Sequence, residues 1–401
     1  MTALGAEAAV KIKAQKRNTG LEVITKHTIC SITHKEVLYM AYEVDFLAVG
    51  DKGQSGDAIS FWYGDLGGDR DGQTVVVIDA GFTDTGKELA DHIEKYYGTK
   101  IVDLVISTHP DQDHINGLTY ILENMEVKEL WIHQPWEHNE LLKDEFSDGR
   151  ITNDSMEQRL KDNLQKSYDL VKLAKSKGII VNEPYTGLQF GENLRILGPT
   201  KDYYISLVPD FDGMPKRKQT ADASTFRNFL ETAVAFVKRK AAGWGKDELD
   251  NEDTTSAKNN SSAITQLDID GRRLLFTGDA GVTALSNAAD EIETLAVSDL
   301  KFFQVPHHGS KRNLGPEVLN RLIGKPLGEG EKKGVSAFVS CAIDGKPKHP
   351  SAKILNSLTH RGVNVVTTKG TGKYSRHETD MRVGWSEATI EDYKWEYEET
   401  E

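Results

Sequence analysis

Four side chains that commonly bind metal ions lie close together in the run HPDQDH. They are His109, Asp111, Asp113 and His114. Buried carboxylates need partners, and a bound cation is one such partner. The run follows a short apolar stretch, and α/β proteins usually place their active sites at the end of a buried strand. The chain has only two cysteines, which excludes a cysteine-rich zinc site. A metal ion would therefore be held by histidine and carboxylate.

Other aspartates and histidines also follow short apolar runs. Asp79 ends VVVIDAG, Asp279 ends LLFTGDA, and His307 and His308 end FFQVPHHGS, while His349 follows a fourth run. Any one of these could be an ordinary turn residue. If the apolar runs are neighbouring strands, however, their carboxyl ends share one edge and the side chains converge there.

The elements that must position these residues alternate between strands and helices. Alternating or β-branched runs predict strands over residues 37–49, 58–64, 73–81, 101–108, 127–134, 300–306, 335–343 and 363–368. Helical spacing marks residues 88–98 and 117–125. Asp270-Gly271, between two alternating runs, predicts a hairpin of residues 262–270 and 272–280. This order predicts an α/β fold built in layers.

Composition limits the kinds of partner. The 401 residues carry a formal net charge of −13, which disfavours tight, sequence-independent binding of duplex nucleic acid, although local charge distribution decides. No apolar run approaches the roughly 20 residues that span a bilayer. The N-terminus lacks the apolar stretch of a signal peptide. We therefore expect a cytoplasmic protein without a membrane partner.

The order of the motifs resembles the metallo-β-lactamase superfamily from about Val44 to Thr368. Within it, the chain is similar to the ComEC-type branch, named for the nuclease-like domain of the bacterial DNA-uptake channel. The similarity is carried by VGDKGQSGDAI, VIDAG, STHPDQDHINGL, the NNSSAITQL–TGDA hairpin and VPHHGS. It implies a four-layer αββα sandwich over residues 37–385, with a helical and charged insertion at about 136–258. Residues 1–36 would then be an N-terminal extension, and residues 386–401 an acidic tail.

Two departures from the common superfamily pattern affect the metal. The usual motif is HxHxDH, but here Asp111 replaces its second histidine. The later histidine of the GHTPG type is missing, and Asn259-Asn260-Ser261-Ser262 takes its place. Both are features of the ComEC-type branch. The site is therefore rich in oxygen ligands, which favours Mn²⁺ or Mg²⁺ and leaves Zn²⁺ possible.

The resemblance implies a site for two divalent metal ions. His109 and Asp111 would hold one ion, and Asp279 would bridge the two. The second ion would be held by Asp113, His114 and one of the adjacent histidines, with His308 favoured as the ligand and His307 as a neighbouring group. Asp79 would orient a ligand loop from behind.

Further residues are candidates for catalysis or substrate binding. Asp113 is expected to be essential as a metal ligand, and His349 could stabilise the leaving oxygen or grip phosphate, or could equally be a surface histidine before a helix. Ser310 and Lys311 are candidate phosphate contacts beside the HHGS motif. Asn260 and Ser262 could contact substrate or metal, or form a plain turn.

Three functions remain open at this point. The leading one is a metal-dependent phosphodiesterase or nuclease that cleaves DNA or RNA with water activated by two metals. The alternative is a small-molecule hydrolase acting on a cyclic nucleotide, a phosphate ester or a lactone, which the acidic net charge slightly favours. The third is a subunit of a larger assembly, for example in defence, activated by a protein partner that docks on the N-terminal segment.

Overall fold

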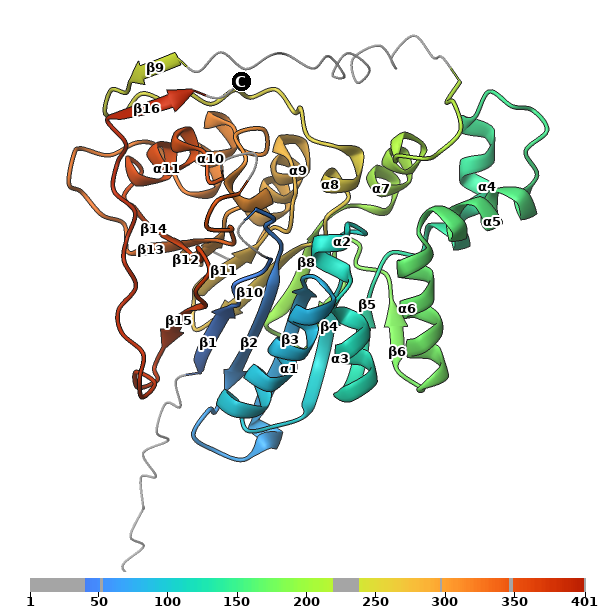
Figure 1. Cartoon of the computed structure of the whole chain (residues 1–401), viewed down its shortest axis with the longest axis horizontal. Helices are drawn as coiled ribbons and strands as arrows, with labels where there is room; N and C mark the ends of the chain where they lie inside the picture. The colour runs from blue at the N-terminus through green and yellow to red at the C-terminus, as the bar shows by residue number, and fades with distance from the viewer. Residues whose placement is uncertain (1–39, 51–52, 219–237, 296–297, 346–348, 400–401) are drawn as a thin grey trace, which may run out of the picture. The chain divides into compact units, whose positions relative to one another are not determined.

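Two mixed β-sheets form the centre of the protein (Figure 1). The computed structural model describes residues 40–50, 53–218, 238–295, 298–345 and 349–399. The predicted N-terminal extension, residues 1–36, lies outside the described residues. Within the described part, the helices lack the combined length and apolarity that a membrane span requires.

The first sheet has seven strands, and the four at one side of it are parallel. In sheet order the seven strands are β15 (Lys373–His377), β1 (Ala41–Phe46), β2 (Ala58–Gly64), β3 (Gln73–Ala80), β4 (Ile101–Ile106), β5 (Glu126–Trp131) and β6 (Ile180–Asn182). Strands β3 to β6 run parallel, so their carboxyl ends lie at one edge. The run VVVI of β3 is buried throughout, as a strand covered on both faces requires.

The second sheet repeats this arrangement. Its members in sheet order are β14 (Val363–Thr367), β13 (Val335–Val339), β12 (Asp299–Gln304), β11 (Arg272–Phe276), β10 (Ile264–Ile269), β8 (Leu194–Gly198) and β7 (Gln189–Phe190). Strands β11 to β14 are parallel. The predicted hairpin joins β10 to β11, and its turn residues Asp270 and Gly271 have φ of 48° and 73°. Two positive φ angles are what a tight two-residue hairpin turn needs.

Aromatic side chains pack the two sheets against each other. Phe61 of β2 stacks on Phe276 of β11 with ring centroids 4.9 Å apart, and Phe46 of β1 meets Phe338 of β13 at 5.4 Å. The outer face of the first sheet is covered by α1 (Thr83–Tyr96), α3 (Leu118–Asn124) and α6 (Gln165–Ser176). The second is covered by α9 (Val282–Glu293), α10 (Pro316–Leu322) and α11 (Ala352–Thr359) (Figure 1). The predicted αββα sandwich is therefore confirmed.

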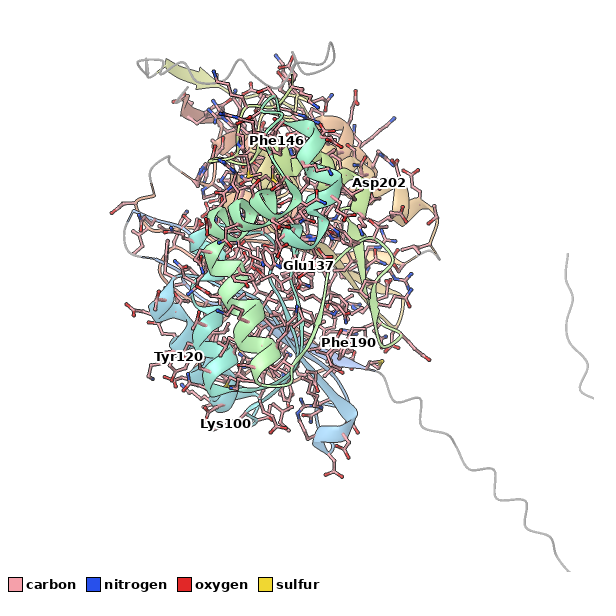
Figure 2. All side chains as sticks on the ribbon, turned by 90° about the vertical axis from the view of Figure 1, so that its right-hand side faces the viewer. Lys100, Tyr120, Glu137, Phe146, Phe190 and Asp202 are labelled. Carbon is pink, nitrogen blue, oxygen red and sulfur yellow. The ribbon has the colours of Figure 1, made fainter. Side chains whose placement is uncertain are left out.

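The range predicted as an insertion, residues 136–258, contains both added helices and strands of the two sheets. Strands β6, β7 and β8 fall inside it. The added helices include α4 (Asn139–Leu142), α5 (Asn153–Asn163) and α7 (Lys201–Leu207). Figure 2 faces these helices and shows Phe146, between α4 and α5, at the opposite end from Lys100, which precedes β4. The helices α4 and α5 thus lie toward the carboxyl ends of the parallel strands.

The C-terminal residues pack against the sandwich. Strand β16 (Glu396–Glu399) pairs with β9 (Lys238–Ala241), and Lys394 exchanges two hydrogen bonds with the Asn356 side chain of α11. The range predicted as an acidic tail, residues 386–401, thus contains residues that bond to the domain.

A buried arginine fastens the segment after β15 to the first sheet. The Arg382 guanidinium pairs with Glu43 at 2.5 Å and with Asp45 at 2.6 Å, and it lies over the rings of Tyr96 and Tyr374. Burial opposes ionisation of Asp45, but His92 and Arg382 outweigh it and lower the pKa of that carboxyl. The planar guanidinium satisfies two carboxylates at once, which a lysine could not do as well.

Replacing this arginine should destabilise the protein strongly. Arg382→Met removes the arginine partner of two buried carboxylates, and breaking a buried ion pair in this way costs about 3–5 kcal/mol. Urea denaturation should show this loss, while Arg150→Met, which removes an exposed pair with Asp148, should leave the midpoint unchanged. An equal effect of the two substitutions would contradict the inferred role of Arg382.

Candidate metal centre

The carboxyl ends of β3, β4, β11 and β12 bring the acidic residues and histidines together. The carboxylate of Asp279, just after β11, lies between the imidazoles of His109, in the loop after β4, and His114, in α2 (Gln112–Ile115). Its Oδ1 is 3.3 Å from His114 Nε2, and its Oδ2 is 3.7 Å from His109 Nε2. Residues separated by some 170 positions in the chain thus share one site, at the sheet edge where the sequence placed them.

Several buried polar atoms at this point lack a hydrogen-bond partner among the described residues. They are His109 Nε2, His114 Nε2, His308 Nε2 and Asp279 Oδ1. A buried polar atom without a partner is costly, so several facing one space are unusual. All four are atoms that bind divalent cations. The residues present therefore fit a metal centre.

The ligand atoms form two groups that meet at Asp279. In the first, Asp113 Oδ2 lies 3.4 Å from His308 Nε2 and 3.9 Å from His114 Nε2. Asp113, His114 and His308 together could hold one ion. In the second, Asp111 Oδ2 lies 3.7 Å from His109 Nε2. Since the two oxygens of Asp279 face different groups, this carboxylate could serve both.

His307 also faces this centre. Its Nε2 is 3.7 Å from Asp279 Oδ2, on the side of His109. Asn313 donates its amide N–H to the Asp279 carbonyl, which leaves Asn313 Oδ1 to accept the Nδ1 proton of His307 at 2.9 Å. The Nε2 lone pair then points into the site. His307 is therefore placed to complete the group of His109 and Asp111. The sequence had predicted it only as a group that neighbours the ligands.

The backbone at the two adjacent histidines is unusual. His307 and His308 have φ of 47° and 57°, in the left-handed region that residues other than glycine rarely adopt. Such strain concentrates at functional sites. His308 Nδ1 bonds the Ser340 carbonyl at 3.0 Å, which leaves its Nε2 toward Asp113. The turn thus directs neighbouring imidazoles to the two ligand groups.

Asp79 lies behind the ligands. Its Oδ2 accepts from His114 Nδ1 at 2.8 Å and from Thr108 Oγ1 at 2.5 Å, and its Oδ1 accepts from the Thr108 backbone N–H at 2.9 Å. With these oxygens occupied, Asp79 is better suited to orienting His114 than to binding an ion. The hydrogen bond to Nδ1 fixes the ring so that Nε2 faces Asp279.

Asp57 belongs to the site but was not singled out in the sequence. It is fully buried, its Oδ2 accepts from Gln304 Nε2 at 2.8 Å, and the same oxygen is 3.9 Å from His114 Nδ1. Burial raises its pKa, although His114 and His308 act in the opposite direction. Asp57 lies in the motif VGDKGQSGDAI, but an aspartate before an apolar run is typical of a turn. Only its contacts across the fold reveal its place.

Asn260 and Ser262 are both buried and hold the Asp279 loop. Asn260 Oδ1 accepts from the Gly281 backbone N–H at 3.1 Å, and Ser262 Oγ accepts from the Asp279 backbone N–H at 3.1 Å. The two side chains therefore lie behind the ligands, where they bond the loop backbone and do not face a substrate.

The remaining predicted residues lie along the HHGS turn. Ser310 is buried, and its Oγ accepts from the Arg312 backbone N–H at 3.3 Å, while the following Lys311 is partly exposed. The ring of His349 is 6.1 Å from that of His307. Burial and the nearby His308 and His307 lower the pKa of His349 to about 4. His349 is therefore a neutral imidazole at neutral pH.

The charges within the centre change the pKa values of its ligands, so metal binding should depend on pH. Burial disfavours protonation of His308, but the nearby carboxylates of Asp113 and Asp279 outweigh this and raise its pKa to about 9. For Asp113, burial is likewise outweighed, here by His114 and His308, and its pKa falls to about 2. Without metal, His308 is protonated at pH 7, so an ion that binds its Nε2 must displace that proton.

Metal affinity should therefore rise with pH. At pH values below the His308 pKa of about 9, metal affinity should rise about tenfold per unit increase in pH for each imidazole proton that the ion displaces. Titration calorimetry of Mn²⁺ at pH 7.5, in buffers of different ionisation enthalpy, should show at least one proton released per centre. An affinity that stays constant from pH 7 to 9, without proton release, would exclude His308 as a ligand.

Asp113→Ala should remove one bound ion while leaving the fold intact. Its side chain is 30% exposed and makes no contribution to the apolar core, so unfolding should change little. Elemental analysis should show about one metal ion fewer per chain, and metal-dependent turnover should fall by about 10³-fold or more. Asp299→Ala, at an exposed pair with Lys301, is the control. Wild-type metal content in Asp113→Ala would refute the ligand group.

Comparison with known sequences places the chain near one superfamily. Residues 70–174 match the family model described as Metallo-beta-lactamase superfamily, a segment that includes Asp79 and the HPDQDH run. ComE operon protein 3 of Bacillus subtilis (strain 168) is 26% identical over 117 residues, which are 29% of this chain. That match spans only 13% of the relative's own length.

Solved structures with low sequence identity were also found. One is a subclass B3 metallo-beta-lactamase isolated from a soil metagenome library, 10% identical with a TM-score of 0.27, covering 70% of this chain and 85% of that one. Another is a diphosphatase from the PhnP family, 10% identical with a TM-score of 0.32, covering 84% and 98%.

Proposed function

We propose that this chain, a hydrolase of the metallo-β-lactamase superfamily, is a phosphodiesterase that cleaves DNA or RNA. The observation that carries the proposal is the donor set that meets at Asp279. Three carboxylates, those of Asp111, Asp113 and Asp279, stand among the imidazoles, with four buried ligand atoms unpaired within the described structure. Such an oxygen-rich set favours hard divalent ions, Mn²⁺ or Mg²⁺ ahead of Zn²⁺, which suit phosphoryl oxygens.

Each ligand group is assigned one ion in this proposal. Asp113, His114 and His308 would hold the first, His109, Asp111 and His307 would hold the second, and Asp279 would serve both groups. When bound, two divalent ions activate a water and offset the charge that builds on a phosphodiester during hydrolysis.

The protein's own residues orient these groups and the substrate. Asp79 fixes the ring of His114, and Ser262 and Asn260 hold the backbone of the Asp279 loop. His349, neutral at pH 7, is suited to donate a hydrogen bond to the leaving oxygen and is unsuited to act as a cation. Lys311 is our candidate for an outer phosphate contact.

A small-molecule substrate is the second candidate. The net charge of −13 favours it over a long polyanion, since nucleic-acid binding usually needs a basic face. A cyclic nucleotide or phosphate ester would use the same phosphoryl chemistry, whereas a lactone would not. Activation by a protein partner at the N-terminal segment is compatible with either substrate.

Cleavage assays separate these candidates. The protein, with its metal content measured, is incubated with single- and double-stranded DNA, RNA, a cyclic nucleotide and a lactone, each with Mn²⁺, Mg²⁺ or Zn²⁺. We expect nucleic-acid cleavage that is fastest with Mn²⁺ or Mg²⁺ and is lost in Asp113→Ala. Hydrolysis of the lactone alone, or no cleavage of any phosphodiester by fully loaded protein, would overturn the proposal.

A further inference from the structure

A lysine that has no role in the preceding assignments lies at the edge of the metal centre. Lys258 belongs to α8 (Ala257–Asn260), which lies beside α2 (Gln112–Ile115) (Figure 1). Its Nζ is 3.9 Å from Asp111 Oδ1, and the side chain is only 19% exposed. A separation of 3.9 Å is longer than a hydrogen bond, which ends near about 3.2 Å. Among the residues that the structure describes, the ammonium has no hydrogen-bond acceptor, so its donors can serve another group.

The backbone under Lys258 is firmly held. The helix α8 is capped by Ser256, whose Oγ accepts from the Asn259 backbone N–H at 3.0 Å, and the Lys258 carbonyl accepts from Ser261 Oγ at 2.6 Å. The next residue, Asn259, lies with its Nδ2 3.1 Å from His307 Nδ1. The same loop thus positions a ligand group and the lysine, which fixes the base of the side chain relative to the centre.

The charges around Lys258 indicate which kind of ligand its ammonium could bind. An ammonium has no lone pair and cannot bind a metal ion. The other oxygen of Asp111, Oδ2, faces His109 Nε2 within the second ligand group. Once Asp111 shares its charge with a cation there, the half-buried ammonium of Lys258 stands beside another positive charge. Two divalent ions and this ammonium would together exceed the charge of the three ligand carboxylates, so a further anion beside them would be stabilised.

Other acidic groups nearby do not supply that anion. Asp79 is occupied by Thr108 and His114, and Asp57 bonds Gln304. A phosphodiester brings a non-bridging oxygen that can contact a metal ion and an ammonium together, and lysine is a common point charge for phosphate. A neutral ester brings no such charge.

We infer that Lys258 forms a phosphate subsite at the side of the His109 and Asp111 group, where its ammonium binds a non-bridging oxygen of the scissile phosphodiester. This inference rests on the proposed function and deepens it. The lysine makes the centre selective for anionic phosphodiesters over neutral esters such as lactones.

Phosphate binding tests the subsite without relying on turnover. Titration calorimetry measures the affinity of the metal-loaded protein for inorganic phosphate, with metal content determined on the same samples. Lys258→Met keeps the length of the side chain and removes its charge, so phosphate affinity should fall about tenfold or more with metal content unchanged. Lys258→Arg should stay within about threefold of wild type, since it keeps the charge.

The matched control is Lys128→Met. Lys128 also pairs with an aspartate, Asp103, at 2.8 Å, but near the beginnings of β4 and β5, away from the centre. The phosphate affinity of Lys128→Met should equal that of the wild type. Phosphate affinity that is unchanged in Lys258→Met would overturn the subsite. So would a loss of bound metal in that variant, because the lysine would then serve only to support Asp111.

Turnover distinguishes failure of the subsite from failure of the proposed function. With bis(4-nitrophenyl) phosphate, Lys258→Met should lower kcat/KM by about 10- to 100-fold. If Lys258→Met keeps the kcat/KM of the wild type, the subsite is refuted. The proposed function still stands in that case, provided that the wild type cleaves the phosphodiester. A wild type that binds phosphate through Lys258 but cleaves no phosphodiester would uphold the subsite and refute the function.

Discussion

The carboxylate of Asp279 is buried among three imidazoles, and much of the surrounding structure keeps it there. Burial disfavours its charge, but His114 and His307 outweigh that effect and hold its pKa well below the usual range. A buried anion needs compensating cations, and imidazoles alone leave its Oδ1 without a hydrogen bond among the described residues. Metal ions on both sides would satisfy this oxygen and the Nε2 atoms that face it.

Most supporting contacts are bonds between loops, made by neutral polar side chains. Ser262 and Asn260 bond the backbone after β11, Asn313 bonds both His307 and the Asp279 carbonyl, and Gln304 reaches Asp57. Being neutral, these amides and hydroxyls can be fully buried at modest cost once bonded. They hold the charged ligands in position without competing for the ion.

The metal centre and the Arg382 clamp contain different kinds of ion pair. At the metal centre the carboxylates outnumber the fixed cations, and Lys258 stands 3.9 Å from the nearest one. At the clamp formed by Arg382, Glu43 and Asp45, the charges meet at 2.5–2.6 Å and are enclosed by aromatic rings. The clamp is satisfied within the protein, as a structural element should be. Among the described residues the ligand atoms of the centre stay unpaired, which is what the proposed binding of metal ions requires.

The sequence by itself determined the α/β layers and most strand positions, and it predicted the candidate ligands. Strand β2 was predicted at its observed bounds, and β3 and β4 to within two residues, because apolar runs and Asp-Gly turns are local signals. HPDQDH was recognisable because its ligands are neighbours in the chain. Strand β15 and the short strands β6 to β8 were harder to predict, because they are brief and pair only at or near sheet edges.

Only the tertiary structure decided which groups meet. Asp57 and Lys258 carry no local signal, and they join the centre through contacts with Gln304 and Asp111, distant in sequence. The direction of His307 depends on a positive φ and on Asn313, neither of which a motif reveals. Asn260 and Ser262 were predicted to contact substrate or metal or to form a plain turn, and the structure buries both against the Asp279 loop. Sequence spacing reports residue types along one chain, whereas a metal centre depends on distances between several loops, which packing of the two sheets fixes.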